Sequence, residues 1–113
     1  MYEPQDPRQK FIDMCIEHLY KKYHKTHKPT GCTRLIDYPR YKLKRFTLTL
    51  VNKNNHEFLI SCYIDYDSFN KLQNDEDFVF ENLFDKKIQY HYDNSCEYYF
   101  SYKEAGDLFL SKI

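Results

Sequence analysis

The stretch FTLTLVNKNNHEFLISCYI, residues 46–64, decides the fold, because a short polar run separates two segments whose apolar residues recur at every second position. This periodicity is typical of strands that bury one face. A three-residue loop, 53–55, lets Asn52 pair with His56 and brings the two apolar faces together, whereas a loop of two or four residues would set each apolar face against a polar one. The sequence therefore predicts an antiparallel hairpin. Its apolar pairs are Phe46 with Cys62, Leu48 with Ile60 and Leu50 with Phe58.

A basic run, residues 40–45, precedes this hairpin. Its apolar residues, Tyr41 and Leu43, stand at odd-numbered positions, whereas those of the following strand stand at even-numbered positions. One extra residue, a β-bulge near residues 44–46, restores the pattern and extends the hairpin to 41–51 and 56–66. Opposite charges then face each other across the strands, so part of the basic run is expected to be neutralised within the fold. The predicted cross-strand pairs are Lys42 with Asp65 and Arg40 with Asp67.

The chain before the hairpin predicts an amphipathic helix over residues 6–25. Asp6 is a suitable N-cap, Pro7 suits the first helical position, and Gln9 has the spacing of a capping box. Apolar residues recur along one face at helical spacing, which predicts burial of that face. They are Phe11, Ile12, Cys15, Ile16, Leu19, Tyr20 and Tyr23.

Turn-forming residues divide the segments on either side of the central hairpin. Pro29 and Gly31 are expected to end the first helix, and residues 32–37 are expected to form a short strand. After the hairpin, Asp67 is a candidate cap for a short helix over residues 68–73. These segments therefore add one strand and one short helix to the predicted fold.

The C-terminal part predicts a second hairpin, 86–92 with 96–102, because its aromatic and aliphatic residues again share one parity. The predicted pairs are Tyr92 with Cys96, Tyr90 with Tyr98 and Ile88 with Phe100. A terminal helix follows, in which Ser101 and Glu104 have the spacing of a capping box.

Residues 74–85 fit either a strand or a helix, and the acidic residues at their start favour a helix. Together the segments predict an α+β fold, in which N-terminal and C-terminal helices pack on an antiparallel sheet of roughly five strands built from the two hairpins. The length predicts a single globular domain over residues 1–113. With 12 Tyr and 9 Phe, its core is expected to be aromatic.

Several broad functions are excluded by composition. The two glycines, Gly31 and Gly106, are isolated, so the chain has no glycine-rich phosphate loop, dinucleotide fingerprint or nucleophile elbow. We expect neither a secretory signal nor a membrane span, and the four widely spaced cysteines are expected to be reduced thiols in the cytoplasm. The abundance of Lys, Asn, Tyr, Phe and Ile indicates an AT-rich gene, as in many phages and mobile elements.

A metal site or a catalytic group has weak support. His24, His27 and Cys32 have zinc-like spacing, but solvated histidines are ordinary at a helix end. Asp65 with Asp67 resembles a magnesium-binding pair, and His91 near Glu97 resembles a base with its orienting carboxylate. Helix capping by Asp67 and cross-strand pairing of Asp65 explain the first pair better, and His91 with Glu97 needs no role beyond an exposed cross-strand pair. The sequence therefore predicts no metal, no cofactor and no enzymatic activity.

Charge is unevenly distributed although the net charge is zero. Residues 1–56 contain 12 Lys and Arg against 5 Asp and Glu, giving +7, and residues 57–113 contain the reverse, giving −7. This asymmetry indicates either a nucleic-acid surface or two halves that pack together and neutralise each other. The candidate partner-binding residues are Arg34, Tyr38, Lys44, Arg45, Asp75, Glu76 and Asp77.

Two functional hypotheses follow. The first is a small non-enzymatic inhibitor, of the toxin-immunity or anti-defence type, that forms a complex with another protein such as a nuclease or toxin; Tyr and Arg are good interface anchors, and acidic segments can mimic nucleic acid. The alternative is a nucleic-acid-binding accessory protein that uses the basic, Tyr-rich residues 34–45. The neutral total charge, and the acids predicted opposite the basic run, count against the alternative.

Overall fold

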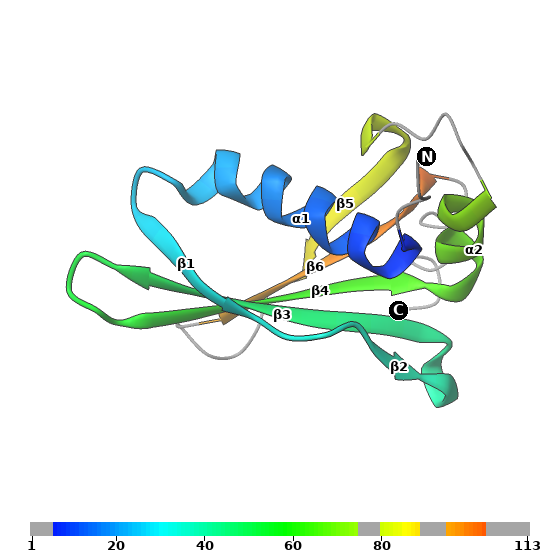
Figure 1. The fold of residues 1–113 in the computed structure, drawn as a ribbon, viewed down its shortest axis with the longest axis horizontal. Helices are drawn as coiled ribbons and strands as arrows, with labels where there is room; N and C mark the ends of the chain where they lie inside the picture. Colours follow the sequence, from blue (N-terminus) through cyan, green and yellow to red (C-terminus); the bar gives the residue numbers. More distant parts are fainter. Residues whose placement is uncertain (1–5, 75–79, 89–94, 104–113) are drawn as a thin grey trace, which may run out of the picture.

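The computed structural model describes residues 6–74, 80–88 and 95–103, which Figure 1 shows in colour. Within these residues the fold is α+β, as predicted, with two helices and a six-stranded sheet. The helices and strands are α1 (Pro7–Tyr23), β1 (His27–Cys32), β2 (Ile36–Tyr38), β3 (Leu43–Asn52), β4 (Glu57–Asp65), α2 (Tyr66–Asn74), β5 (Leu83–Ile88) and β6 (Ser95–Tyr102). Two 3₁₀ turns, Pro39–Tyr41 and Phe80–Asn82, precede β3 and β5.

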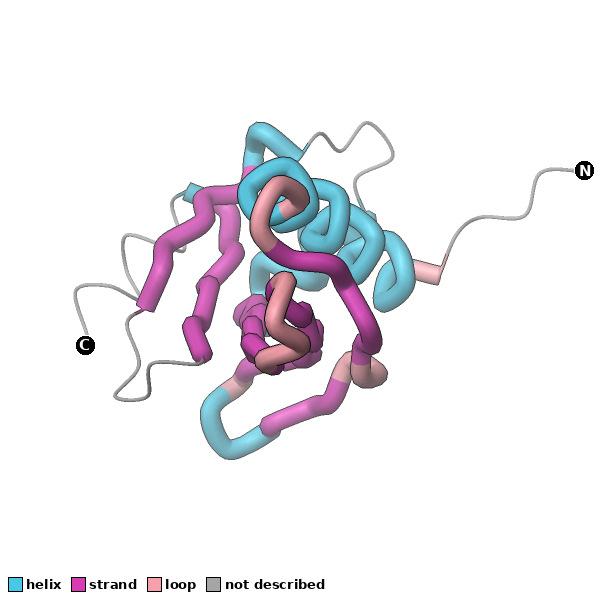
Figure 2. Tube along the Cα trace, turned by 90° about the vertical axis from the view of Figure 1, so that its left-hand side faces the viewer, coloured by secondary structure: helices cyan, strands magenta, loops and turns pink. Residues whose placement is uncertain are grey.

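The sheet is mixed, with the strand order β1-β3-β4-β6-β5, and β2 also pairs with β3. The β4 and β6 strands are parallel, and the other neighbours are antiparallel. Figure 2 shows the strands curving round one side of α1. The α1 helix therefore covers much of the apolar face, and α2 adds Phe69 and Leu72 to the same core.

The β3–β4 hairpin confirms the predicted register and turn. Phe46, Leu48 and Leu50 lie opposite the residues expected. The backbone N–H of Asn52 donates to the carbonyl of His56 at 3.1 Å, which closes the three-residue loop. Asn55 has the left-handed conformation that Asn tolerates, with φ of 61°.

The predicted bulge is wrong. The β3 strand starts at Leu43, which pairs directly with Asp65. Leu43 therefore lies on the same side of β3 as Arg45 and not with Phe46, and Lys42, with φ of 52° and ψ of 45°, closes the 3₁₀ turn before the strand. Lys42 and Arg40 therefore lie outside the ladder, and their predicted pairs with Asp65 and Asp67 do not form.

Asp65 instead holds the start of α2. Its carboxylate accepts the backbone N–H of Ser68 at 3.0 Å and the Tyr99 hydroxyl at 2.8 Å. Asp65, and not Asp67 as predicted, therefore caps this helix. Ser68 is buried and its hydroxyl accepts the backbone N–H of Tyr102 at 3.1 Å, so α2 is also joined to β6.

The first helix has the predicted cap and largely the predicted buried face. Asp6 accepts the backbone N–H of Arg8 at 3.0 Å, while Gln9 bonds to Asp13 rather than returning to the cap. The middle of the predicted apolar stripe is buried as expected, but Tyr20, at its edge, is 55% exposed. The buried stripe residues are Phe11, Ile12, Cys15 and Leu19.

Phe11 joins α1 to two strands of the sheet. Its ring makes edge contacts with the rings of Phe46 on β3, at 5.8 Å, and Phe100 on β6, at 6.1 Å. The cysteines Cys15, Cys62 and Cys96 are buried in the same core, as predicted for small apolar side chains.

Pro29 and Gly31 do not act as breakers after the helix, because both lie in β1. This strand is at the edge of the sheet, where a residue without an N–H is tolerated, and its register shifts between these two residues. The predicted strand 32–37 is correspondingly displaced: Cys32 ends β1, and β2 begins at Ile36.

The second hairpin is antiparallel as predicted, but its register is wrong. Phe100 pairs with Asp85 rather than Ile88, and Ile88 pairs with Glu97. Residues 83–85, expected to be helical, begin β5. The placement of β6 beside β4 as a parallel neighbour was not predicted.

Some predictions fall on residues outside the described part. The turn residues 89–94, including His91, and residues 104–113 of the predicted C-terminal helix belong to this group. Ser101, the expected cap of that helix, is buried within β6. Within the described ranges, no helix combines the length and apolarity that spanning a bilayer requires.

Candidate functional site

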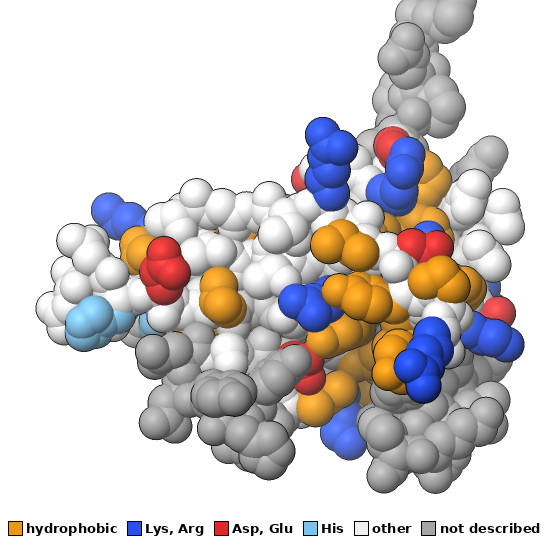
Figure 3. All heavy atoms as spheres, turned by 90° about the horizontal axis from the view of Figure 1, so that it is seen from below, with side chains coloured by type: hydrophobic (Ala, Val, Ile, Leu, Met, Phe, Trp, Pro, Cys, Tyr) orange, Lys and Arg blue, Asp and Glu red, His pale blue; other side chains and the backbone are white. Residues whose placement is uncertain are grey.

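The sheet has an outer face, opposite α1, that carries exposed apolar side chains. Figure 3 shows hydrophobic side chains gathered there, with Lys and Arg side chains around them. Ile36 is 49% exposed and Leu59 41%, and Tyr41, in the 3₁₀ turn between β2 and β3, is 66% exposed. Exposed apolar groups that lie together with charged groups at their rim are typical of interaction surfaces.

Arg45 lies among these residues and is held by two aromatic rings. Its strand position places it opposite Tyr63 on β4 and Ile36 on β2. Its guanidinium lies 5.9 Å from the ring centres of both Tyr38 and Tyr63. One nitrogen, Nη2, donates to Thr47 Oγ1 at 3.4 Å. Arginine stacked on aromatic rings keeps its N–H donors in a fixed plane.

The carboxylates nearest this region are already hydrogen-bonded to tyrosines. Glu97 accepts the hydroxyl of Tyr63, and Asp37 accepts that of Tyr66. The bond to Asp37 raises the pKa of Tyr66 to about 12. None of the ion pairs among the described residues involves Arg40, Lys42 or Arg45. These three cationic groups therefore form no ion pair with the acidic residues that the structure describes.

The structure separates the residues predicted to bind a partner. Tyr38 and Arg45 are adjacent, as described above. Lys44 points to the other side of β3, where its ammonium lies 3.7 Å from Asp37 and 4.9 Å from the ring centre of Phe69. Arg34 lines a groove of about 580 Å³ beside α1, next to Arg8. The acidic residues Asp75, Glu76 and Asp77 lie outside the described residues.

Sequence reasoning missed the contribution of Tyr63, Leu59 and Ile36. A signal was present in residues 57–65, where Leu59 and Tyr63 occupy the solvent-facing parity of a strand that has one buried face. Polar residues are the rule at such positions in an antiparallel sheet. The predicted bulge concealed the contact between Arg45 and Tyr63, because it left Arg45 without a cross-strand neighbour.

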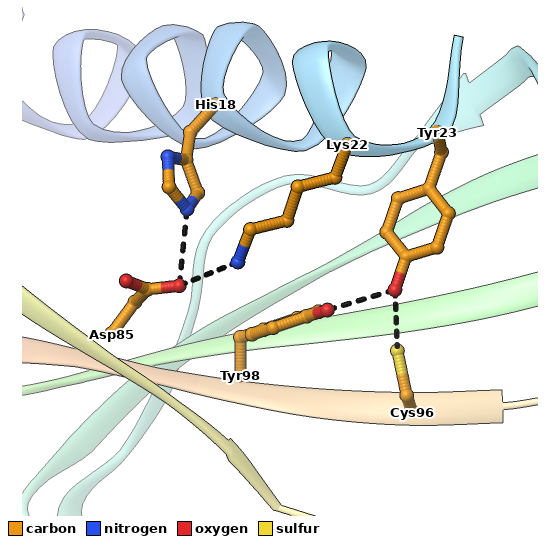
Figure 4. Close-up of polar contacts among 6 residues, drawn as sticks. All are labelled: His18, Lys22, Tyr23, Asp85, Cys96 and Tyr98. Atoms are coloured by element: carbon orange, nitrogen blue, oxygen red, sulfur yellow. Dashed lines mark hydrogen bonds and ion pairs between the residues drawn. The ribbon is translucent and has the colours of Figure 1, made fainter. Parts of the chain in front are cut away.

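A second cluster, the α1–β5 network, lies between the helix and the sheet (Figure 4). Asp85 Oδ2 is 3.0 Å from His18 Nε2 and accepts a hydrogen bond from Lys22 Nζ at 2.8 Å. The ammonium of Lys22 also lies 4.7 Å from the ring centre of Tyr98. The hydroxyl of Tyr98 is 2.8 Å from that of Tyr23, which lies 4.0 Å from Cys96 Sγ.

The electrostatics of this network favour a fixed arrangement. Burial alone raises the pKa of Asp85, but the hydrogen bonds from Lys22 and His18 outweigh it and hold the pKa below its ordinary value. Burial raises the pKa of Tyr23 and of Tyr98, so both stay protonated. The network fastens α1 to the C-terminal strands, and its polar atoms are used for contacts within the fold.

The candidate metal ligands are not brought together. His24 Nδ1 lies 3.1 Å from the carbonyl of Tyr20, and His27 Nδ1 lies 2.7 Å from the hydroxyl of Thr26. Cys32 is at the opposite end of β1 from His27. Within residues 6–74, 80–88 and 95–103, no three His, Cys, Asp or Glu side chains form a group that could hold a metal ion.

Comparisons with protein families, curated proteins and solved structures gave no match to this chain. A functional interpretation therefore depends on geometry. The α1–β5 network is occupied by internal contacts, whereas the outer face presents exposed groups to solvent. The outer face is the better candidate site.

Proposed function

We propose that the chain is a non-enzymatic binding protein that forms a specific complex with another protein through the Arg45 patch, and that it acts as an inhibitor of the toxin-immunity or anti-defence type. The Arg45 patch consists of Ile36, Tyr38, Arg45 and Tyr63, and Tyr41 lies in the 3₁₀ turn that joins its strands β2 and β3. The observation that carries this proposal is Arg45 held between two tyrosine rings among exposed apolar side chains.

The composition and rigidity of the patch support a protein partner. Tyr and Arg dominate the binding energy of many protein interfaces, and large apolar groups around them exclude water. Tyr38, Arg45 and Tyr63 are carried by hydrogen-bonded strands. Little conformational entropy is therefore lost when a partner docks. An inhibitor requires only such a surface, since it acts by covering its target.

The test compares two exposed tyrosines on different faces. Tyr41 is 66% exposed in the turn beside the patch and Tyr20 is 55% exposed on α1, so neither replacement by Ala disturbs the core. We expect Tyr41→Ala to weaken the complex about tenfold or more, and Tyr20→Ala to leave it unchanged. The complex would be captured from the native host on the immobilised protein, identified by mass spectrometry, and its affinity measured for both variants. Equal affinities for the two variants would contradict the proposal.

A second candidate function, nucleic-acid binding, is favoured by one observation. Asp65 and Asp67, which were predicted to neutralise Lys42 and Arg40, do not pair with them in the structure. Rings of the patch could stack on unpaired bases while these cations hold phosphates. The zero net charge still counts against it.

The nucleic-acid alternative has its own test. Replacing Arg40, Lys42 and Arg45 together by Gln should weaken binding of a labelled single strand and reduce the slope of log affinity against log salt by about 2. The matched control replaces three exposed lysines elsewhere, Lys25, Lys28 and Lys53, by Gln. It should leave the slope unchanged. Binding that is insensitive to salt would exclude this function.

A further inference from the structure

We propose that the partner protein docks an acidic surface on the Arg45 patch, with carboxylates that pair with Arg45 and with Arg40 and Lys42 at its edge. This inference rests on the proposed function and specifies the chemistry of the partner at the same site. Three features support it: the guanidinium close to two rings, the absence of ion pairs at Arg40, Lys42 and Arg45 among the described residues, and the exposed apolar groups beside them.

The guanidinium of Arg45 is positioned before any partner arrives. It lies 5.9 Å from the ring centres of Tyr38 and Tyr63, and one of its nitrogens donates a hydrogen bond to Thr47 Oγ1 at 3.4 Å. Arginine has five N–H donors in a planar fork that matches the two oxygens of a carboxylate. Because the rings restrict the side chain, less rotamer entropy is lost when the pair forms.

Arg40, Lys42 and Arg45 form no ion pair with the described acidic residues, whereas Lys44 on the other side of β3 pairs with Asp37. Asp37 and Glu97 accept tyrosine hydroxyls, and Asp65 caps α2 and accepts another. Arg40 lies 5.8 Å from the ring centre of Tyr41 and joins no ion pair among the described residues, as is true of Lys42. An acidic partner complements this surface, while a basic partner is repelled.

The apolar groups distinguish a protein from a polynucleotide. Ile36 pairs directly with Arg45 in the β2–β3 ladder and is 49% exposed. Its aliphatic side chain gains most from a partner that offers apolar side chains beside its carboxylates. Single-stranded nucleic acid offers phosphates and flat bases, which do not cover an isoleucine in this way. The combination favours an acidic protein surface.

The test uses synthetic probes of defined charge. Peptides of repeated Glu-Glu-Leu and repeated Lys-Lys-Leu, equal in length, and an oligothymidylate with the same charge as the acidic peptide are titrated into the labelled protein and followed by NMR. We expect the acidic peptide to bind about tenfold more tightly than either other probe at low salt. The largest shifts should fall on the Arg45 side-chain N–H and on the amides of β2 and β3.

Arginine replacements then identify the contact. Arg45→Gln should weaken binding of the acidic peptide about fivefold to tenfold, and Arg45→Lys should restore only part of it, because lysine lacks the planar fork. Arg8→Gln, at the start of α1, is the matched control and should have no effect. Arg40→Gln, an exposed replacement, provides a second test if Arg45→Gln lowers stability. It should weaken binding about twofold to fivefold.

Three outcomes would overturn the inference. These are equal binding of the acidic and basic peptides, unchanged affinity in both Arg45→Gln and Arg40→Gln, and tighter binding of the oligothymidylate. The comparison of Tyr41→Ala with Tyr20→Ala is independent of charge. Suppose that Tyr41→Ala weakens the complex but the protein binds acidic and basic peptides equally. The proposed function would then stand, and only this inference would be wrong.

Discussion

Lys42 and Asn55 are the non-glycine residues with positive φ in the described parts of the chain. Asn tolerates this conformation because its side chain can bond locally, so the turn at Asn55 was predictable. A lysine gains no such compensation, and its left-handed conformation costs about 1 kcal/mol. The alternation of basic and apolar residues in 40–45 instead predicts a strand that includes Lys42. That reading required the bulge that the structure does not contain.

Replacement of Lys42 by Gly should relieve this strain. We expect Lys42→Gly to leave the free energy of unfolding unchanged or to raise it by about 0.5–1 kcal/mol, whereas Lys42→Ala keeps the strain and gains nothing. Urea denaturation measures both. Arg40→Gly, in the same turn but without positive φ, is the control and should lower stability by about 0.5–1 kcal/mol. A loss in Lys42→Gly as large as in Arg40→Gly would contradict the strain argument.

At the scale of elements, the two aspartates at the start of α2 have different roles. Asp65→Ala removes a helix cap and the hydrogen bond from Tyr99, and should lower the free energy of unfolding by about 2 kcal/mol. Asp67→Ala, two residues later in the first turn of α2 and exposed, should change it by less than about 0.5 kcal/mol. Thermal or urea unfolding of the two variants distinguishes them. Similar losses would indicate that Asp67 shares the capping role.

The elements that could be predicted are those specified by local patterns. The α1 helix has a cap, a proline at its first position and an apolar stripe, all within one segment. The β3–β4 hairpin has a short loop, so parity alone fixes its register. Neither prediction required knowledge of distant parts of the chain.

The register of β5 with β6 could not be predicted in this way. Four consecutive residues of β6, from Tyr98 to Ser101, are buried, because this strand lies inside the sheet with both faces covered. A strand buried on both faces gives no parity signal, and a parallel neighbour cannot be inferred from hairpin rules. The candidate site was affected similarly: Tyr38 and Arg45 were named from their own segment, but Tyr63 reaches them from another strand.

At the scale of the whole molecule, the α1–β5 network links the two ends of the described chain and should contribute pH-dependent stability. The pKa of Asp85 is lower in the folded state than its ordinary value, so its contribution is present above about pH 4 and is lost as the pH falls through the folded pKa. Asp85→Asn should therefore lower stability by about 1 kcal/mol at neutral pH and by less in acid.

The measurement is urea unfolding of wild type and Asp85→Asn at several values of pH between about 2 and 7. The difference between the two proteins should shrink as the pH falls. Asp67→Asn is the matched control, with a small difference at neutral pH. A difference for Asp85→Asn that stays constant down to the lowest pH would show that its carboxylate charge does not stabilise the fold.

The position of β6 between β4 and β5 determines the order in which the molecule can be assembled during synthesis. The β1, β3 and β4 strands are joined by short connections and can pair early, but Tyr23 on α1 reaches Tyr98 across 75 positions of sequence. Until β6 emerges from the ribosome, one edge of β4 stays open beside an apolar surface that α1 covers incompletely. Nascent chains in that state are vulnerable to pairing with one another, and refolding should be limited by the docking of β6 against β4.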